Sequence, residues 1–139
     1  FMKIPAQILS KSLNLEVDIL QTSLWINDGN GKFKLQELPV EAQQAPIYTS
    51  LFFQDSKSND FLILAGNQSR NKPEMGSNLG SYGWLLNHTK NDTWMVSLPE
   101  ESGLVLPGES RDLHKIIINN KPYLIAVRNN DEPILFEIR

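Results

Sequence analysis

The sequence predicts an all-β protein, and three observations carry this prediction. From Ser23 onward, short apolar segments alternate with turn residues at intervals typical of β-sandwiches and β-propellers. A hairpin-like unit occurs twice, about sixty residues apart, as in repeat architectures. Hydrophobic residues make up 40% and charged residues 21% of the 139 positions, as in ordinary globular domains. We therefore expect one folded domain, or part of one, made of antiparallel strands.

The first 22 residues differ in pattern from the rest of the chain. Between Ile4 and Gln21 the apolar residues stand at mixed spacings, and Pro5 lies near a plausible helix start. We expect a short helix followed by an extended run over residues 1–22, and strands over residues 23–139. The nine expected strands are residues 23–27, 32–36, 48–53, 61–65, 81–87, 93–98, 113–118, 122–128 and 133–138.

Polar turns separate these strands. Residues 27–31, with the sequence Asn-Asp-Gly-Asn-Gly, offer several positions that tolerate a positive φ, as tight hairpins require. Residues 119–121 and 129–131 are similar Asn-rich turns. The longest irregular stretch, residues 67–80, contains one proline and two glycines and is too polar for a core. We expect it to be an ordered loop or a binding loop.

The repeated unit can be aligned by eye. One copy runs from Trp25 to Pro39, and the other from Trp84 to Pro99. Each copy has an aromatic-led strand, a polar turn rich in Asn and Asp, a second strand with an aromatic residue, and a closing Leu-Pro pair. The alignment places Trp25 opposite Trp84 and predicts two copies of one hairpin module.

Charge and cysteine content exclude several function classes. A net charge of −3 gives no basic field, so neither nucleic acid nor an anionic membrane surface is an expected partner. The chain has no cysteine, which excludes disulfides, thiolate nucleophiles and Cys-based metal sites. Neither the h-region of a signal peptide nor a membrane-spanning run occurs. The chain is then either cytosolic or a mature or internal piece of a longer exported precursor, and we expect the second.

A set of motifs, taken in order, resembles a known family. The motifs are Leu24 to Phe33, Leu38-Pro39 with Glu41-Ala42-Gln43, Leu64 to Asn67, Ser81-Tyr82-Gly83 with Leu85-Leu86, Ser102-Gly103, Arg111-Asp112 and Arg128 to Asp131. Together, from about Ser23 to Phe136, they resemble the C-terminal end of FG-GAP/VCBS repeat proteins, whose related members are described as cartilage-acidic-protein-like or ASPIC/UnbV proteins. Each motif alone is weak, and the resemblance rests on the ordered set.

The resemblance implies a fold and a kind of function. The fold is two to three four-stranded antiparallel β-propeller blades, forming the C-terminal part of a larger ring and preceded by the short N-terminal segment. The function is non-catalytic adhesion or binding of a protein or carbohydrate ligand, in an exported protein at the cell surface, in the periplasm or outside the cell. Other blades of the same propeller are expected partners. Exposed strand edges recruit other chains, so self-association is expected as well.

Blades of this family typically carry a calcium loop, in which Asp and Asn residues supply oxygen ligands to the cation. The matching stretch here is residues 55–61, and its expected metal ligands are Asp55, Asn59 and Asp60. The stretch lacks the family's glycine, and Lys57 brings a positive charge into the turn. The alternative is a plain turn between two strands. No other cofactor is expected.

Seven residues are candidates for ligand binding. Six stand in the 67–80 loop or in polar clusters near strand ends, and the seventh, Tyr82, is an aromatic residue of the expected strand 81–87. The seven residues are Asn67, Arg70, Glu74, Tyr82, Arg111, Asp112 and Arg128. For Tyr82 the alternatives are stacking on a sugar ring and packing in the core. For Arg128 the structural alternative is a salt bridge to Asp112 or Asp131.

A competing hypothesis is a fragment of a carbohydrate-active enzyme. Its acid and base would come from Glu101, or its neighbour Glu100, and from Glu109 with Asp112. Against it, the chain has no phosphate-binding glycine loop, no nucleophile elbow and no His-x-x-x-His pair. The two histidines are isolated, and we assign no catalytic residue. A third reading is purely structural, in which the chain closes a propeller ring and has no site of its own.

Overall fold

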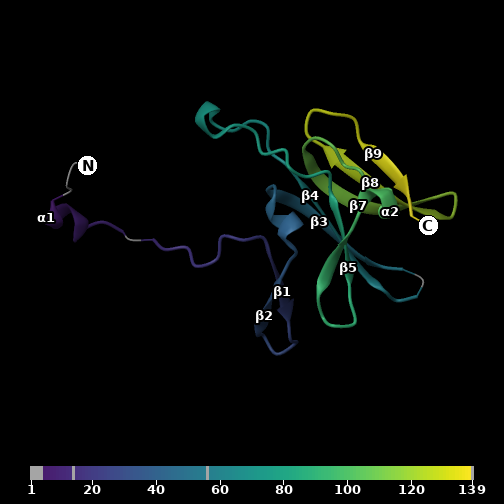
Figure 1. Cartoon of the computed structure of the whole chain (residues 1–139), viewed down its shortest axis with the longest axis horizontal. Helices are drawn as coiled ribbons and strands as arrows, with labels where there is room; N and C mark the ends of the chain where they lie inside the picture. Colours follow the sequence, from purple (N-terminus) through teal and green to yellow (C-terminus); the bar gives the residue numbers. More distant parts are fainter. Residues whose placement is uncertain (1–4, 14, 56, 139) are drawn as a thin grey trace.

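Antiparallel β-sheets of two, four and three strands form the body of the protein. The computed structural model describes residues 5–13, 15–55 and 57–138 (Figure 1). The first sheet is β1 (Ser23–Asn27) with β2 (Phe33–Glu37). The central sheet is β3 (Ile47–Gln54), β4 (Asp60–Gly66), β5 (Trp84–His88) and β6 (Trp94–Ser97), in that order. The third sheet is β7 (Ser110–Ile118), β8 (Lys121–Arg128) and β9 (Ile134–Glu137).

The prediction of an all-β fold with nine strands is confirmed, with small shifts at the strand ends. The expected four-stranded pattern is present in the central sheet alone, since the first sheet has two strands and the third has three among the described residues. The largest shifts, of three residues each, are at β5, which begins at Trp84 rather than at Ser81, and at β7, which begins at Ser110 rather than at Leu113. The shift at β5 has a visible cause. The positive φ of Gly83, 79°, breaks the extended backbone just before that point.

Short helical turns accompany the strands. The expected N-terminal helix is present as α1 (Ala6–Leu9), directly after Pro5, whereas residues 1–4 and 14 lie outside the described residues. The following residues up to 22 are irregular and extend away from the sheets (Figure 1). Sequence reasoning missed η1 (Val40–Gln43), η2 (Pro73–Met75) and α2 (Pro99–Ser102). A proline stands at the start of each, which is a helix-start signal that could have identified them.

The central sheet is buried on both faces, and β4 shows this most directly. Ile63 and Ala65 pack in one hydrophobic cluster with residues of the third sheet, such as Leu124. Leu62 and Leu64, which point to the opposite face, pack in a second cluster with Leu24 of the first sheet. The continuous apolar run of β4 is therefore the result of a stack in which the central sheet lies between the other two.

The first sheet and the outer half of the central sheet have the same geometry. Asn27 pairs with Phe33 across a five-residue turn, and His88 pairs with Trp94 across another. Each residue of the β1–β2 hairpin therefore has a counterpart in the β5–β6 hairpin, 61 positions later in the sequence. The sequence alignment of Trp25 with Trp84 was wrong by two positions, because turns of equal length set the register. The counterpart of Trp25 is Leu86, and that of Phe33 is Trp94.

Three five-residue turns, at residues 28–32, 55–59 and 89–93, repeat the same hydrogen bonds. In each one, the first residue's N–H donates to the carbonyl of the fifth, over 2.9, 3.1 and 2.8 Å. The fourth residue, which is Gly31, Ser58 or Asp92, has φ of 78°, 62° or 57°. The three hairpins are therefore the same structural unit, although their sequences differ.

The inner strands of the central and third sheets repeat as well. β3 and β7 each contain a β-bulge near the start, and the extra residues are Tyr48 and Arg111. The residues that follow β4 and β8 are both asparagines. The N–H of Asn67 donates to the carbonyl of Pro46 at 3.0 Å, and the N–H of Asn129 donates to that of Glu109 at 2.8 Å. The stack is therefore built from one repeated sheet unit.

None of the helices formed by the described residues has both the length and the apolar character needed to cross a membrane.

Candidate functional site

Polar side chains gather where β4 ends, β7 begins and β8 ends. We call this group the polar junction; its members are Asn67, Gln68, Ser69, Glu109, Arg111 and Asn129. The bulges and the Asn-terminated strands of the repeat bring these positions together, because they place equivalent ends of neighbouring sheets side by side. The junction holds two of the predicted ligand-binding residues, Asn67 and Arg111.

Asn67 is the buried centre of the junction, with 2% of its surface exposed. Its side-chain amide donates to the carbonyls of Ser81 and Gly108 at 2.6 and 2.8 Å, and its side-chain oxygen accepts from the N–H of Ser81 at 3.1 Å. Its φ is 77°, in the left-handed region that asparagine tolerates better than most residues. Asn67 therefore ties three chain segments together and has no side-chain group turned to solvent.

Glu109 is buried, with 7% exposed, and its carboxylate receives several donors. Ser69 donates its backbone N–H to one oxygen, while Asn129 and Arg111 donate to the other at 2.7 and 2.6 Å. Hydrogen bonds from Ser69 and Asn129, together with the charge of Arg111, lower the pKa of Glu109 from 4.5 to about 2. The carboxylate is therefore ionised at neutral pH and cannot supply a proton there as a general acid.

This lowered pKa predicts acid sensitivity of the fold. Because the folded pKa lies below the unfolded one, ionised Glu109 stabilises the fold above about pH 4.5, and this contribution is lost as the pH falls towards about 2. Glu109→Gln should flatten the dependence of the unfolding free energy on pH in this window, measured by urea unfolding between about pH 6 and about pH 2.5. Glu74→Gln is the control, since Glu74 is exposed in the 67–80 loop, away from the buried carboxylate. Equal slopes in the wild type and Glu109→Gln would contradict the assignment.

Arg111 is held on several sides. Its guanidinium donates to the carbonyl of Asn67 at 3.0 Å, to the side-chain oxygen of Gln68 at 3.1 Å and to Glu109. It also lies over the ring of Tyr48, 4.3 Å from the centroid. The Tyr48 hydroxyl donates to the same Gln68 oxygen at 3.1 Å. The bulge residues of the central and third sheets, Tyr48 and Arg111, thus stack on each other. Arg111 thereby connects the two sheets.

Arg128 forms a salt bridge with Asp131, which is one of the two partners that the sequence analysis offered as the alternative to ligand binding. Its guanidinium lies 2.6 Å from the carboxylate of Asp131 and donates to the carbonyls of Glu132 and Pro107 at 2.8 and 3.2 Å. Its side chain is 10% exposed. Next to it is a shallow hollow of about 220 Å³ whose lining includes Arg70, Leu79, Glu109 and Asp131. Of the predicted ligand residues, Arg70 is the one that lines this hollow.

The remaining predicted ligand residues lie outside the junction. Asp112 pairs with His114 at 2.8 Å, which lowers the pKa of Asp112. Tyr82 is 57% exposed and lies just before β5, so the alternative of core packing is wrong. Glu74 lies in η2, within the projecting loop of residues 67–80, which we call the arm (Figure 1). The arm is ordered by a bridge between Gln68 and Asn78.

The expected calcium loop is one of the three equivalent five-residue turns. One oxygen of Asp55 accepts the N–H groups of Lys57 and Asn59 at 2.8 and 2.9 Å, and the other accepts the side-chain amide of Asn59 at 2.8 Å. These hydrogen bonds lower the pKa of Asp55, and the bond from the side chain of Asn59 has the largest effect. Asp60 accepts from Gln54 at 2.7 Å. No group of three or more His, Cys, Asp or Glu side chains among the described residues is placed to hold a metal, and calcium binding stays a prediction.

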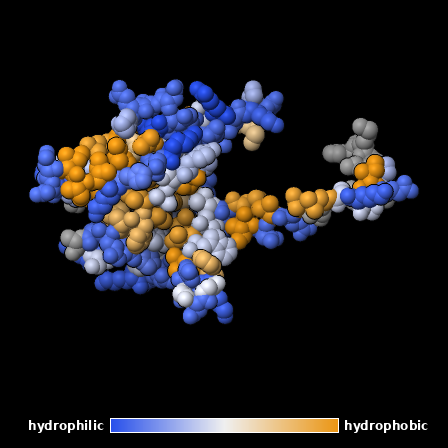
Figure 2. Space-filling view, turned by 180° about the vertical axis from the view of Figure 1, so that it is seen from behind, coloured by the Kyte–Doolittle hydropathy of each residue, from blue (hydrophilic) through white to orange (hydrophobic). Residues whose placement is uncertain are grey.

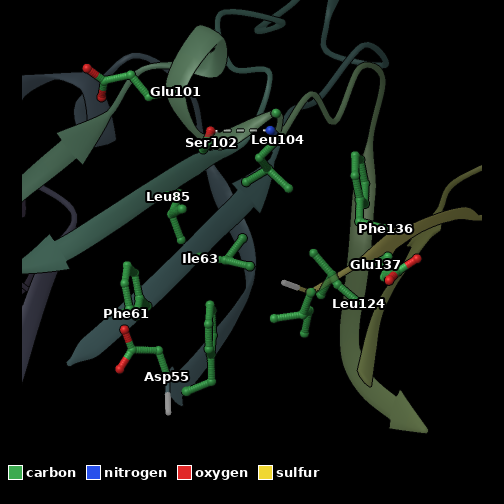
Figure 3. A pocket seen from close by; sticks show the side chains of 13 residues that line it. Asp55, Phe61, Ile63, Leu85, Glu101, Ser102, Leu104, Leu124, Phe136 and Glu137 are labelled. Carbon is green, nitrogen blue, oxygen red and sulfur yellow. Dashed lines mark hydrogen bonds between the residues drawn. The ribbon is translucent and has the colours of Figure 1, made fainter. Parts of the chain in front are cut away.

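A second, larger hollow lies between the central and third sheets, away from the junction. This groove has a volume of about 630 Å³, and Phe61, Ile63 and Leu85 face Leu124 and Phe136 across it (Figure 3). Glu101, from α2, lies at its rim, as do Asp55 and Glu137. The two carboxylates of the glycosidase hypothesis, Glu101 and Glu109, therefore line different hollows.

Sequence reasoning missed Gln68, Ser69 and Asn129 as junction residues, and it missed Tyr48 as the ring under Arg111. Only the asparagine had a usable signal, since an asparagine follows an apolar strand in both repeats. Comparisons with protein-family models, with curated proteins and with solved structures found no match to the chain. The resemblance to FG-GAP/VCBS repeats is therefore carried by the motifs alone.

Proposed function

We propose that the chain is a non-catalytic binding scaffold made of consecutive β-propeller blades of the FG-GAP/VCBS kind, in an exported protein, and that it contacts a protein or carbohydrate ligand through the arm. The observation that carries this proposal is the polar junction. Its charged and amide groups are engaged with one another and with the backbone, and they fasten the root of an exposed loop.

The repeated sheet unit supports the propeller part of the proposal. Propeller blades are four-stranded antiparallel meanders that stack face to face, with their first strands nearest the axis. The central sheet has the meander order β3-β4-β5-β6, and its first strand contacts the first strand of the third sheet. The first sheet then corresponds to the two outer strands of a preceding blade, and the third sheet to the first three strands of the next.

The state of the carboxylates supports a scaffold over an enzyme. A glycosidase needs two carboxyl groups facing one substrate, one of them able to hold a proton near neutral pH. Glu109 has a lowered pKa and three protein donors, and Glu101 lines the other hollow. Asp112 is paired with His114 rather than with Glu109. This arrangement of carboxylates is better suited to holding chain segments together than to transferring protons to a substrate.

The arm is the surface best placed for a ligand. Its root is fixed by Asn67 and by the contact of Ser69 with Glu109, so ordering it costs little entropy on binding. Its exposed residues include Met75, which is 69% exposed, and Leu79, which is 48% exposed. Arg70, Lys72 and Glu74 add charges of both signs. A mixed apolar and charged surface of this kind suits a protein partner, and the neighbouring Tyr82 suits a sugar ring.

Shortening the arm tests this proposal. Residues 70–76 are replaced by Asn-Gly, which closes Ser69 and Ser77 into a tight hairpin. Wild type and variant are then applied to a glycan array and to an array of immobilised extracellular proteins. We expect binding to weaken by about tenfold or more while the thermal midpoint stays unchanged, because the junction and the sheets are retained.

The matched control replaces Asn120 by glycine, in the two-residue turn between β7 and β8. This turn is equally exposed and lies on another sheet, so binding should be unaffected. Full binding by the arm variant, or no binding of the wild type to either array, would count against the arm as a contact surface.

A further inference from the structure

We infer that a second copy of this chain donates residues 15–20 as a fourth strand beside β9, with its apolar side chains in the groove between the central and third sheets. This inference goes beyond ligand binding and does not depend on the arm. It rests on an acceptor and a donor that the structure leaves uncovered, and on the repeat that relates the sheets.

The acceptor is the third sheet. In the central sheet, β5 is followed by β6, whose Trp94 and Val96 pack towards the first sheet. Among the described residues, β9 pairs only with β8, so its other edge keeps unpaired N–H and C=O groups. The groove of about 630 Å³ opens beside this edge (Figure 3). A fourth strand at β9, packed like β6, would point its alternate side chains into the groove.

The donor is the segment that precedes β1. Its odd positions, Leu15, Val17 and Ile19, are apolar and are 79%, 68% and 40% exposed, whereas residues 16 and 18 are acidic. Alternation with a period of two is the pattern of a strand with one buried face. Figure 2 shows apolar atoms along this segment where it extends from the body. Its pattern thus fits a strand added beside β9.

The donor must come from another molecule, because the root of the segment is fixed far from the groove. The backbone of Thr22 exchanges two hydrogen bonds with the side chain of Gln43, at 2.7 and 3.0 Å. The first sheet, which follows, packs on the face of the central sheet opposite the groove. In Figure 1 the segment and β9 lie at opposite ends of the molecule. Each copy therefore carries one donor and one acceptor.

Strand addition also sets which side chains are neighbours. On β9, Phe136 faces the groove and Leu135 faces the other side, whereas Glu137 lies at the rim of the groove. With Val17 and Ile19 in the groove, Asp18 lies on the face of Leu135. Neighbouring strands bring Cα atoms to about 5 Å, which is within the reach of a disulfide.

The test uses the absence of cysteine from the chain, since any disulfide must then come from introduced residues. Full-length Asp18→Cys is mixed with full-length Leu135→Cys, and with Glu137→Cys to cover a register shifted by two residues. Both positions on β9 and position 18 are exposed, so the fold should tolerate these changes. Met75→Cys, on the arm, is the matched control acceptor. Sedimentation velocity of the unmodified chain is measured over a range of concentrations.

We expect concentration-dependent association and a mixed disulfide between position 18 and position 135 or 137, in clear excess over the Met75→Cys control. Adding Val17→Asp to the donor should lower the yield by about tenfold or more, because a carboxylate enters an apolar groove. A monomer at every concentration, a yield no higher than the control, or disulfides only between like chains would each overturn the inference.

Discussion

Gly66→Ala is expected to lower the free energy of unfolding by about 3 kcal/mol or more, since it forces a steric clash that well-packed surroundings cannot absorb. Gly66 is the last residue of β4 and pairs with Ile47. An added Cβ would lie 1.9 Å from the carbonyl oxygen of Pro46 and 2.9 Å from the Cα of Ile47. Both are backbone atoms, and the same Pro46 carbonyl accepts from Asn67 at 3.0 Å. Moving them apart opens the end of the sheet.

The control separates this clash from the general cost of replacing glycine. Gly103→Ala places a Cβ in open space, and only its left-handed backbone, with φ of 68° and ψ of 4°, is unfavourable, for a cost of about 1 kcal/mol. The two variants are compared by urea unfolding at neutral pH, with circular dichroism to confirm that each one folds. A loss for Gly66→Ala no greater than that for Gly103→Ala would show that β3 and β4 do not approach as closely as described.

This close approach could not be predicted from the sequence. Gly66 lies inside an apolar run that reads as a strand, and its counterpart in the third sheet is Arg128, whose side chain folds back on Asp131. Equivalent positions thus carry the smallest and one of the largest side chains. The local pattern does not reveal that backbone atoms of Pro46 and Ile47 occupy the space of a Cβ at Gly66.

The strands themselves were predictable because their signals are local. Alternation, β-branched residues and Asn-rich or Gly-rich turns define all nine. Burial on both faces of β4 could be read from its continuous apolar run. The register of the repeat could not, because Trp25 and Trp84 look alike, whereas the equal turn lengths that set the true register were hidden by different turn sequences.

The candidate site was predictable only in part, since its contacts join distant positions. Arg111 and Asn67 were chosen as polar residues near strand ends, and the structure places them together. Tyr48, on which Arg111 stacks, and Ser69, which donates to Glu109, carry no signal that spacing could detect. At Asp55 the composition pointed to oxygen ligands, but the same oxygens accept backbone N–H groups within a turn. Composition alone does not separate these two uses of a carboxylate.

Asn67→Ala is expected to destabilise the protein by about 3 kcal/mol, because it leaves the buried backbone N–H and carbonyl of Ser81, and the carbonyl of Gly108, without their partners. The positive φ of 77° adds strain for alanine. Urea unfolding at neutral pH measures the loss. Asn129→Ala is the matched control: this counterpart is exposed, and its side chain donates to Glu109, so its removal should cost about 1 kcal/mol.

Asn67→Gly separates the two causes, because glycine accepts a positive φ but restores no hydrogen bond. We expect Asn67→Gly to recover about 1 kcal/mol relative to Asn67→Ala, with the remaining loss due to the buried groups. Full recovery would mean that backbone strain alone is responsible and that the side chain does not tie the segments together. In that case the arm would lose its fixed root, and its low entropy of ordering would no longer support it as a binding surface.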